Sequence, residues 1–256
     1  MKFTISIMCL IGAMAAFAPP IPVGVFAGKA TVSSGIVSSN SMLSYQKFQD
    51  NLLDSFQSGW SDNNGISFSS GVIGQAVITT REDNSDPCNP IPAKFVSHGN
   101  FSLGSTWTIT MWAYFNDVGS SMWMIEKSTD NTDGFILLME SGASFDFYIT
   151  GTYKLSSSVT VDAGKWYFIV IKQSGTTQSM KVNNGSWETL SNAGYTDAAV
   201  SWKIGASFAD DSGANAVFDE VSIFNRELTD QEITLLVGDF NFGTQTGTPV
   251  RPQLPP

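Results

Sequence analysis

Apolar and polar residues alternate along much of the chain, which is the pattern of β-strands that bury one face. The clearest run is residues 107–115, where every second position from Trp107 to Phe115 is apolar. The positions between them hold Thr108, Thr110 and two aromatic residues, which places these side chains on the opposite face. Similar strand-like runs are found at residues 122–126, 135–140, 145–150, 166–172, 179–183, 200–204 and 217–224.

Polar turn clusters separate these runs. Asp, Asn and Gly gather at residues 130–134, 162–164 and 183–185, and these residue types dominate tight turns because they tolerate unusual backbone angles. Many short strands with turns between them are typical of antiparallel sheets, whereas parallel strands need long crossover connections. The sequence therefore predicts an all-β fold, an antiparallel β-sandwich of two sheets.

One short helix is predicted near the C-terminus. Thr229 and Glu232 stand three residues apart, which is the spacing of a capping box that satisfies free N–H groups of the first turn. Apolar residues follow from Ile233 to Val237, and Gly238 can end the helix. Because a helix this short depends on packing, we expect it to lie against the sandwich.

Composition narrows the possible functions. Only 14% of the 256 residues are charged, and 23 acidic residues against 13 basic ones give a formal net charge of −10. A chain this acidic lacks the clustered Lys and Arg that phosphate contacts need, so nucleic acid is excluded as a partner. Two cysteines, Cys9 and Cys88, and the single His98 exclude a disulfide scaffold and a Cys/His zinc site. We interpret His98 as a surface-loop residue.

The chain divides by composition into four segments. Residues 1–27 start with one Lys and a short apolar run, which has the shape of a secretory signal peptide or of an apolar anchor in a larger particle. Residues 28–44 are rich in Ser, Gly and Val and are interpreted as a linker or N-terminal arm. Residues 45–242 are predicted to form one domain, and the Pro-rich tail 243–256 is expected to be extended or disordered. A cleaved signal would make the protein secreted, with no membrane segment in its mature form.

Four segments resemble the LamG-like branch of the concanavalin A-like lectin and glucanase family, which includes the pentraxins. Residues 71–77 (GVIGQAV), 106–112 (TWTITMW) and 165–170 (KWYFIV) are similar to three of its strands. Residues 218–233 (FDEVSIFNRELTDQEI) are similar to its closing strand, turn and capped helix, and this segment is the most specific of the four. The resemblance covers roughly residues 50–240 and implies a jelly-roll arrangement of the two sheets.

The resemblance also implies a function in recognition. Most members of the family bind glycans or glycoproteins, some with the help of Ca²⁺, although a fold alone does not decide function. In pentraxins an Asp-Asn pair and a second acidic loop hold the ion. The matching candidate calcium ligands here are Asp130, Asn131, Asp210 and Asp211, and another LamG-like arrangement would use Asp62 and Asp219. The alternative is that these are ordinary solvated turn residues.

The glucanases of the same family raise the question of catalysis. A glycosidase needs two carboxylates that face one sugar bond, about 5–10 Å apart. Asp219 and Glu220 are adjacent, so on a regular strand they point to opposite faces, and residues 221–225 hold no further carboxylate. We therefore interpret the pair as structural and expect no enzyme activity.

Aromatic side chains are the usual support for a sugar ring, because the apolar face of the ring packs on an indole or a phenol. Trp123, Tyr153 and Trp187 lie near turns or polar runs and are the candidate ligand-binding residues. Trp60 has a similar setting. The alternative is that such a residue is partly buried at a sheet edge and binds nothing.

These observations favour a non-catalytic recognition module that binds carbohydrate or glycoprotein, with Ca²⁺ as a candidate cofactor, in a secreted, extracellular protein. The alternative is a structural or virion-surface protein, such as a decoration or fibre protein. In that alternative, the apolar N-terminus and the Pro-rich tail make assembly contacts in a larger particle. The jelly roll is then the domain displayed on the virion or cell surface.

Overall fold

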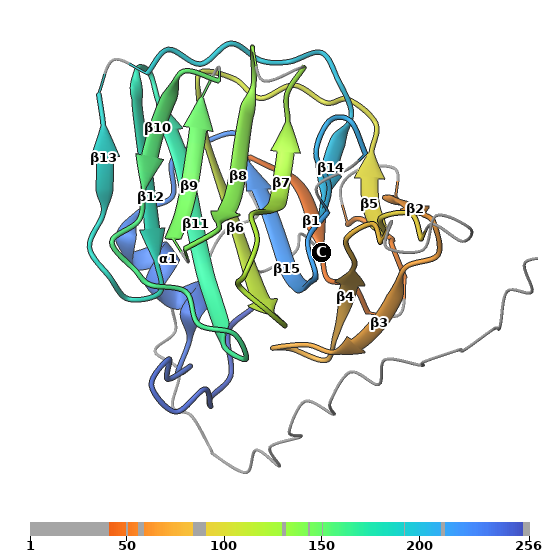
Figure 1. Ribbon diagram of the computed structural model, residues 1–256. Coiled ribbons are helices and arrows are strands. Elements are labelled where there is room, and N and C mark those ends of the chain that lie inside the picture. Colours follow the sequence, from red (N-terminus) through yellow and green to blue (C-terminus); the bar gives the residue numbers. More distant parts are fainter. Residues whose placement is uncertain are drawn as a thin grey trace, which may run out of the picture.

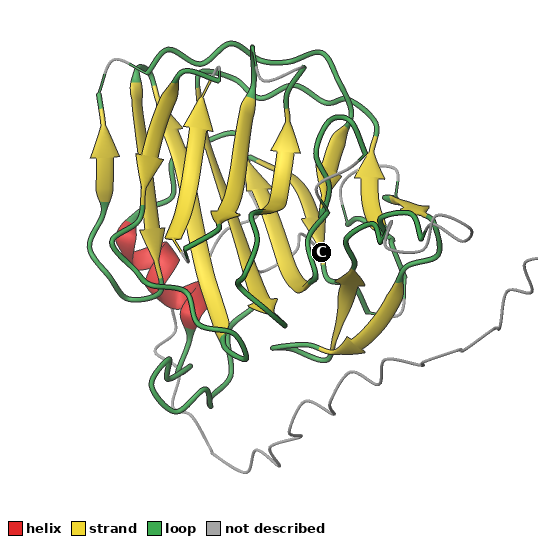
Figure 2. Ribbon diagram, in the orientation of Figure 1, coloured by secondary structure: helices red, strands yellow, loops and turns green. Residues whose placement is uncertain are grey.

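The computed structural model describes residues 41–49, 51–55, 59–83, 91–129, 132–142, 144–149, 151–191, 193–210 and 213–252. The predicted signal peptide or anchor and most of the predicted arm therefore lie outside the described residues. Within them, two antiparallel sheets face each other and one helix lies behind (Figures 1 and 2). This arrangement confirms the predicted all-β jelly-roll sandwich with one short C-terminal helix.

The larger sheet has eight strands in the described part of the chain. Their bounds are β1 Met42–Gln46, β3 Ser67–Ser70, β4 Gln75–Thr79, β6 Thr106–Phe115, β11 Trp166–Ser174, β12 Thr177–Val182, β13 Glu188–Leu190 and β15 Ala216–Phe224. The order across the sheet is β13-β12-β11-β6-β15-β4-β3, and β1 also pairs with β15. Because β1 begins at Met42, part of the predicted arm is a paired strand of the domain.

The smaller sheet has seven strands in the same residues. Their bounds are β2 Ser61–Asn63, β5 Phe95–His98, β7 Met122–Lys127, β8 Phe135–Glu140, β9 Ser144–Ile149, β10 Tyr153–Ser156 and β14 Trp202–Ile204. The order is β10-β9-β8-β7-β14-β5-β2, and Figure 1 shows this sheet toward the viewer. It supplies one wall of the core, and the eight-stranded sheet supplies the other.

β6 has the alternation that the sequence predicts. Its apolar positions from Trp107 to Phe115 are at most 1% exposed and point into the core between the sheets. The centre of the Trp107 ring lies 5.2 Å from that of Phe135 and 6.0 Å from that of Phe147, both on the opposite sheet. Aromatic contacts across the sandwich therefore join the two sheets.

Helix α1 (Asp230–Val237) covers the outer face of the eight-stranded sheet. Thr229 and Glu232 form the predicted capping box, and Gly238 ends the helix as expected. Leu236 and neighbouring apolar residues of the helix pack in one cluster with Trp112, one of the two outward aromatic residues of β6. Among the described residues, no helix has the length and apolar character needed to span a bilayer. No helix of this part of the chain covers the seven-stranded sheet, whose outer face is left open.

The C-terminal segment up to residue 252 packs on the same side as α1, so these residues are an ordered part of the domain rather than a disordered tail. The Gln245 amide oxygen accepts a hydrogen bond from the Trp166 N–H at 2.6 Å. The Val250 N–H donates to the Leu236 carbonyl at 3.1 Å. Composition alone indicated disorder, but backbone contacts with the helix and β11 hold the segment in place.

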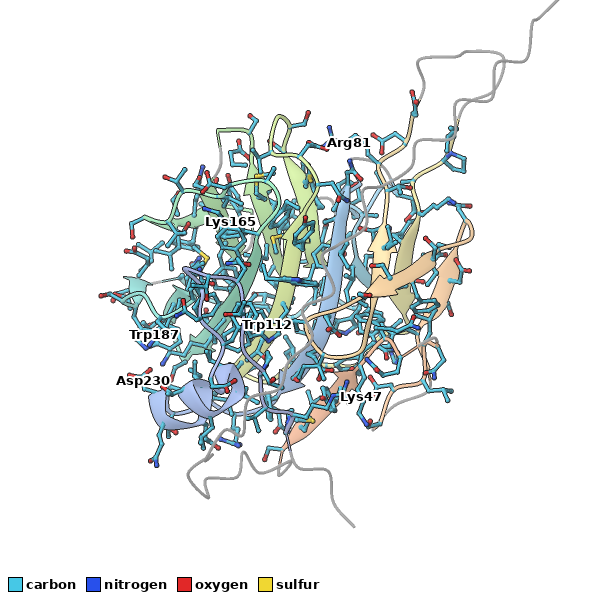
Figure 3. The ribbon with its side chains drawn as sticks, turned by 90° about the horizontal axis from the view of Figure 1, so that it is seen from below. Lys47, Arg81, Trp112, Lys165, Trp187 and Asp230 are labelled. Carbon is cyan, nitrogen blue, oxygen red and sulfur yellow. The ribbon has the colours of Figure 1, made fainter. Side chains whose placement is uncertain are left out.

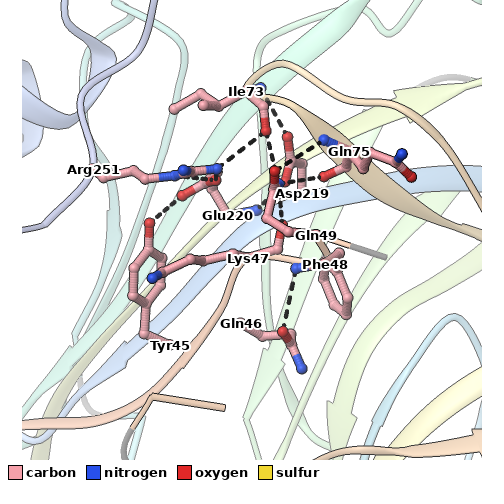
Figure 4. A network of polar contacts seen from close by, with 10 residues as sticks. All are labelled: Tyr45, Gln46, Lys47, Phe48, Gln49, Ile73, Gln75, Asp219, Glu220 and Arg251. Atoms are coloured by element: carbon pink, nitrogen blue, oxygen red, sulfur yellow. Dashed lines mark hydrogen bonds and ion pairs between the residues drawn. The ribbon is translucent and has the colours of Figure 1, made fainter. Parts of the chain in front are cut away.

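A buried polar network fixes the end of this segment to the first strand (Figure 4). The Glu220 carboxylate accepts hydrogen bonds from the Arg251 Nε at 2.8 Å and from the Tyr45 hydroxyl. The side chain of Glu220 is only 6% exposed. Burial raises the pKa of the Glu220 carboxyl, and the neighbouring Arg251 partly offsets this effect. The ion pair therefore connects β1, β15 and the C-terminal segment at one point.

Arg251→Ala removes the cation beside this buried carboxylate. We expect the free energy of unfolding to fall by about 2 kcal/mol, because a buried charged acceptor then loses a charged partner. Urea unfolding followed by fluorescence measures the loss.

The matched control is Lys165→Ala, which removes an exposed ion pair with Asp162. Water already solvates both of those charges, so the control should leave stability nearly unchanged. Equal effects of the two substitutions would contradict a structural role for the buried network.

Candidate functional site

The open outer face of the seven-stranded sheet contains a hollow of 320 Å³. Its floor is apolar, because Ile136 and Leu138 of β8 point outward while the residues between them point into the core. Trp123 of β7 stands opposite Leu138, and Tyr148 of β9 stands opposite Ile136. The hollow therefore combines an apolar floor on one strand with an aromatic side chain on each neighbouring strand.

One rim of the hollow is polar. The Ser121 hydroxyl donates a hydrogen bond to Glu140 Oε2 at 3.1 Å and accepts one from the Ser141 N–H at 3.0 Å. The guanidinium of Arg81 donates to the backbone carbonyl of Ser121 from behind the rim. The indole N–H of Trp123 is buried and has no acceptor among the described residues. The rim thus presents a carboxylate acceptor beside an aromatic wall.

A second carboxylate beneath this face is already paired. Asp146 of β9 is fully buried, and Lys154 Nζ lies 2.6 Å from its Oδ2. The hydrogen bond to Asp146 raises the pKa of Lys154, whose ammonium lies 5.6 Å from the centre of the Tyr148 ring. Only the carboxylate end of this pair is buried, because the Lys154 side chain is 43% exposed. Lys154 thus neutralises the buried Asp146 carboxylate and does not itself line the hollow.

The structure places one of the three predicted aromatic residues, Trp123, at this hollow. Tyr153 lies at the start of β10 and is 36% exposed. Because its neighbour Lys154 points to the outer face, Tyr153 points the other way. Trp123 and Tyr153 therefore lie on different surfaces and do not form one binding site.

Trp187 lies on the opposite side of the molecule, next to α1 (Figure 3). Its indole N–H donates to Asp230 Oδ1 at 2.6 Å, and Lys172 Nζ stands 4.1 Å from its ring centre. These contacts attach the turn after β12 to the first turn of the helix. One face of the indole is thus occupied by a cation, which gives Trp187 a structural contact of its own.

Two other interpretations of single residues are corrected. His98 is only 5% exposed, with its ring centre 5.4 Å from that of Trp60 and 5.2 Å from that of Phe101. It is a buried residue at the end of β5, not a surface-loop residue. Trp60 is 4% exposed and is likewise unavailable as a platform. Local polarity suggested exposure in both cases, but β2 and β5 fold these residues inward.

The candidate calcium ligands fall into two groups. Asp130, Asn131 and Asp211 lie outside the described residues. Asp210 forms an ion pair with Lys203, and Asp62 accepts hydrogen bonds from the N–H groups of residues 65 and 66. No three His, Cys, Asp or Glu side chains of the described chain lie close enough together to hold a metal ion.

Asp219 and Glu220 do not face a cleft. A bulge in β15 follows Asp219, and its carboxylate accepts hydrogen bonds from the N–H groups of Ile73 at 3.0 Å and of Glu220 at 2.9 Å. Burial, together with the charge of Glu220, raises the pKa of Asp219. The cavity beside Glu220 measures only 10 Å³, which is too small for a sugar. The pair serves the polar network of Figure 4 rather than a substrate.

Glu140 and Tyr148 both line the hollow, and neither was predicted from the sequence. Tyr148 could have been found. The signal was present, because the run from Ser144 to Ile149 alternates between polar and apolar side chains up to Phe147. Phe145 and Phe147 are inward, so the alternation would have placed Tyr148 on the outer face with Asp146.

A family model of the concanavalin A-like lectin/glucanases superfamily, Laminin_G_3, matches residues 93–234. This match covers more than half of the chain, and the chain therefore belongs to this family. The Trp123 hollow lies within the matched residues. No protein with a curated description matches the chain.

Several solved structures share the fold. The binding domain of botulinum neurotoxin DC in complex with SialylT has a TM-score of 0.59 and 13% identity, covering 81% of this chain and 52% of that one. Domain 4 of the extracellular arabinanase AbnA from Geobacillus stearothermophilus, in complex with arabinotriose, has a TM-score of 0.59 and 12% identity, covering 76% of this chain and 97% of that one. A structure of botulinum neurotoxin type C has a TM-score of 0.60 and 13% identity, and the match covers 82% of this chain and 52% of that one. Cell entry of this neurotoxin is described as dependent on interaction with two ganglioside molecules. This chain thus spans about half of the neurotoxin chains, and the likeness shows the fold alone.

Calcium binding stays a prediction of the sequence, and melting experiments test it. An ion held by Asp130, Asn131, Asp210 and Asp211 would bind only the folded state, so EDTA should lower the melting temperature and added Ca²⁺ should restore it. Asp210→Asn removes one of the proposed ligands, so this variant should respond less to EDTA than the wild-type protein does. A melting temperature that EDTA leaves unchanged would count against a stabilising calcium site.

Proposed function

We propose that this chain is a non-catalytic module that binds a glycan in the Trp123 hollow. The observation that carries the proposal is the combination of Trp123, an apolar floor and a carboxylate rim on the outer face that α1 leaves uncovered. A sugar ring has apolar C–H faces and a polar edge of hydroxyl groups. The C–H faces can pack on the indole and the apolar floor, and the hydroxyl groups can donate hydrogen bonds to Glu140.

The structural neighbours support a glycan ligand. The arabinanase domain is in complex with arabinotriose, and the type C neurotoxin is described as interacting with gangliosides. The fold match covers 97% of the arabinanase domain but only 52% of the neurotoxin chain, so the arabinanase domain gives the stronger support. A glycoprotein partner would present the same chemistry through its attached sugars, so it falls within the proposal.

The spacing of carboxylates on the open face favours binding without catalysis. Glu126 stands opposite Ile136, which is four residues along β8 from Glu140. At about 3.3 Å per residue, the backbone positions of the two Glu residues are about 13 Å apart along the strand direction. Glu126 is also only 1% exposed, whereas a glycosidase needs two carboxylates that reach one sugar bond. Asp146 is nearer to Glu140, but it is fully buried and paired with Lys154. The face therefore supports recognition of a sugar rather than cleavage of a glycosidic bond.

Trp123→Ala should reduce glycan affinity at least tenfold, since it removes the aromatic wall against which the ring would pack. A broad glycan array identifies the bound sugars, and calorimetry with one of them measures the loss. Tyr153→Ala is the matched control, because it removes an aromatic side chain that points away from the hollow.

Circular dichroism spectra and thermal melting curves should be measured for both variants, to check that each one folds. A larger loss in Tyr153→Ala than in Trp123→Ala would place the site elsewhere. Failure of the wild-type protein to bind any sugar on the array would overturn the proposed function.

The charge of the hollow favours neutral glycans. Glu140 contributes a carboxylate to the lining, and Lys154, which does not line the hollow, is paired with Asp146. The Arg81 guanidinium donates to the backbone carbonyls of Gly213 and of the rim residue Ser121, but Arg81 itself is not part of the lining. An acidic sugar would therefore meet a like charge at the rim. We expect a sialylated glycan to bind about fivefold more weakly than its neutral counterpart.

Glu140→Gln should remove most of this difference, whereas Asp162→Asn, which deletes one negative charge at an exposed site elsewhere, should preserve it. Matched neutral and sialylated pairs on the array provide the measurement. Tighter binding of the sialylated member by the wild-type protein would show that the rim does not select by charge.

A further inference from the structure

A second hollow lies beside the first on the same outer face. It measures 440 Å³, and its lining includes Glu126, Lys203 and Phe208. Glu126 of β7 pairs on one side with Ile136, which lines the first hollow, and on the other with Lys203 of β14. Directly paired residues of neighbouring antiparallel strands have Cβ atoms about 5 Å apart. The two hollows are therefore adjacent parts of one surface.

Together the hollows extend across β9, β8, β7 and β14, which are consecutive in the sheet. Neighbouring strands are about 4.8 Å apart, so the four strands span about 14 Å. This distance is longer than one sugar ring. A single sugar at Trp123 would leave the second hollow empty.

Phe208 gives the second hollow an aromatic side chain of its own. It is 41% exposed, which is unusual for a phenyl ring in this domain, whose aromatic residues are mostly buried. The ammonium of Lys203 donates to the backbone carbonyls of Ser207 and Phe208 and pairs with Asp210. These contacts fix the loop that carries the exposed ring.

The start of the same loop is also constrained. Gly205 has a φ of +88°, and a Cβ atom there would lie 2.5 Å from a side-chain carbon of Thr79. Only glycine fits this conformation beside β4. A ring that is exposed while its loop is held at both ends is preorganised for contact, which lowers the entropy lost on binding.

We infer that the two hollows form one binding face for an extended glycan chain of several sugars, with Trp123 and Phe208 as aromatic platforms in the two hollows. The inference rests on the proposed function and specifies its ligand as a chain rather than a single terminal sugar. The chain lies across the strands, with one part on the floor of β8 and another against Phe208.

The test uses cello-, malto-, xylo- and arabino-oligosaccharides from the monosaccharide to the hexasaccharide, each titrated by calorimetry. For a series that binds, affinity should rise with chain length until both hollows are filled. Phe208→Ala should weaken binding of the hexasaccharide about tenfold and change binding of the shortest bound member less than twofold. Leu53→Ala is the control, because it truncates a side chain that is 72% exposed at another place on the surface.

Ser201→Phe provides an independent variant. Ser201 is exposed and lines the second hollow, so a phenyl group there should fill the space without touching the core. It should reduce long-chain affinity to that of the short chain, as Phe208→Ala does.

Two results would overturn the inference while leaving the Trp123 site intact. One is an affinity that does not change with chain length. The other is unchanged hexasaccharide binding in both Phe208→Ala and Ser201→Phe, while Trp123→Ala abolishes it. If the wild-type protein binds none of these oligosaccharides and nothing on the glycan array, the proposed function falls together with the inference.

Discussion

Burial of both faces of β6 is the constraint on which the rest of the molecule depends. Its inner face carries Trp107, which packs against Phe135 and Phe147 of the opposite sheet. Its outer face carries Trp112, whose ring centre lies 5.0 Å from Phe168 and 4.8 Å from Phe240. Burying an indole is favourable compared with leaving it in water, and the helix and the C-terminal segment cover this face and bury Trp112. That closure makes the two outer faces of the sandwich different.

The seven-stranded sheet protects its outer floor with its own side chains instead. Ile136 and Leu138 are each 5% exposed, although no helix of the described chain covers them. Trp123 and Tyr148 stand on the neighbouring strands beside them, and large amphipathic side chains of this kind keep water away from apolar surface. The groups that shield the floor are also the groups that an incoming sugar would meet. In the proposed function, the same residues would therefore stabilise the sheet and contact the ligand.

The sequence predicts features that depend on neighbours in the chain and misses those that depend on distant ones. Strand alternation and the capping box of Thr229 are local, so β6 and α1 are as expected. The bond between Tyr45 and Glu220 joins residues 175 positions apart, which no local pattern encodes. Exposure is equally non-local. Trp123 and Trp187 both lie close to a turn in the sequence, yet one lines the hollow on the open face and the other is held by Lys172 and α1.

The ion pair of Glu220 has a geometric consequence for how this domain can be carried by a longer polypeptide. Tyr45 and Arg251 contact the same carboxylate, so the entry and exit of the folded unit coincide. They coincide on the α1 side of the sandwich, on the far side from the Trp123 hollow. A unit whose ends meet can be inserted into a host loop or joined in tandem with little distortion. Any such attachment would leave the open face of the seven-stranded sheet pointing outward, away from the tether.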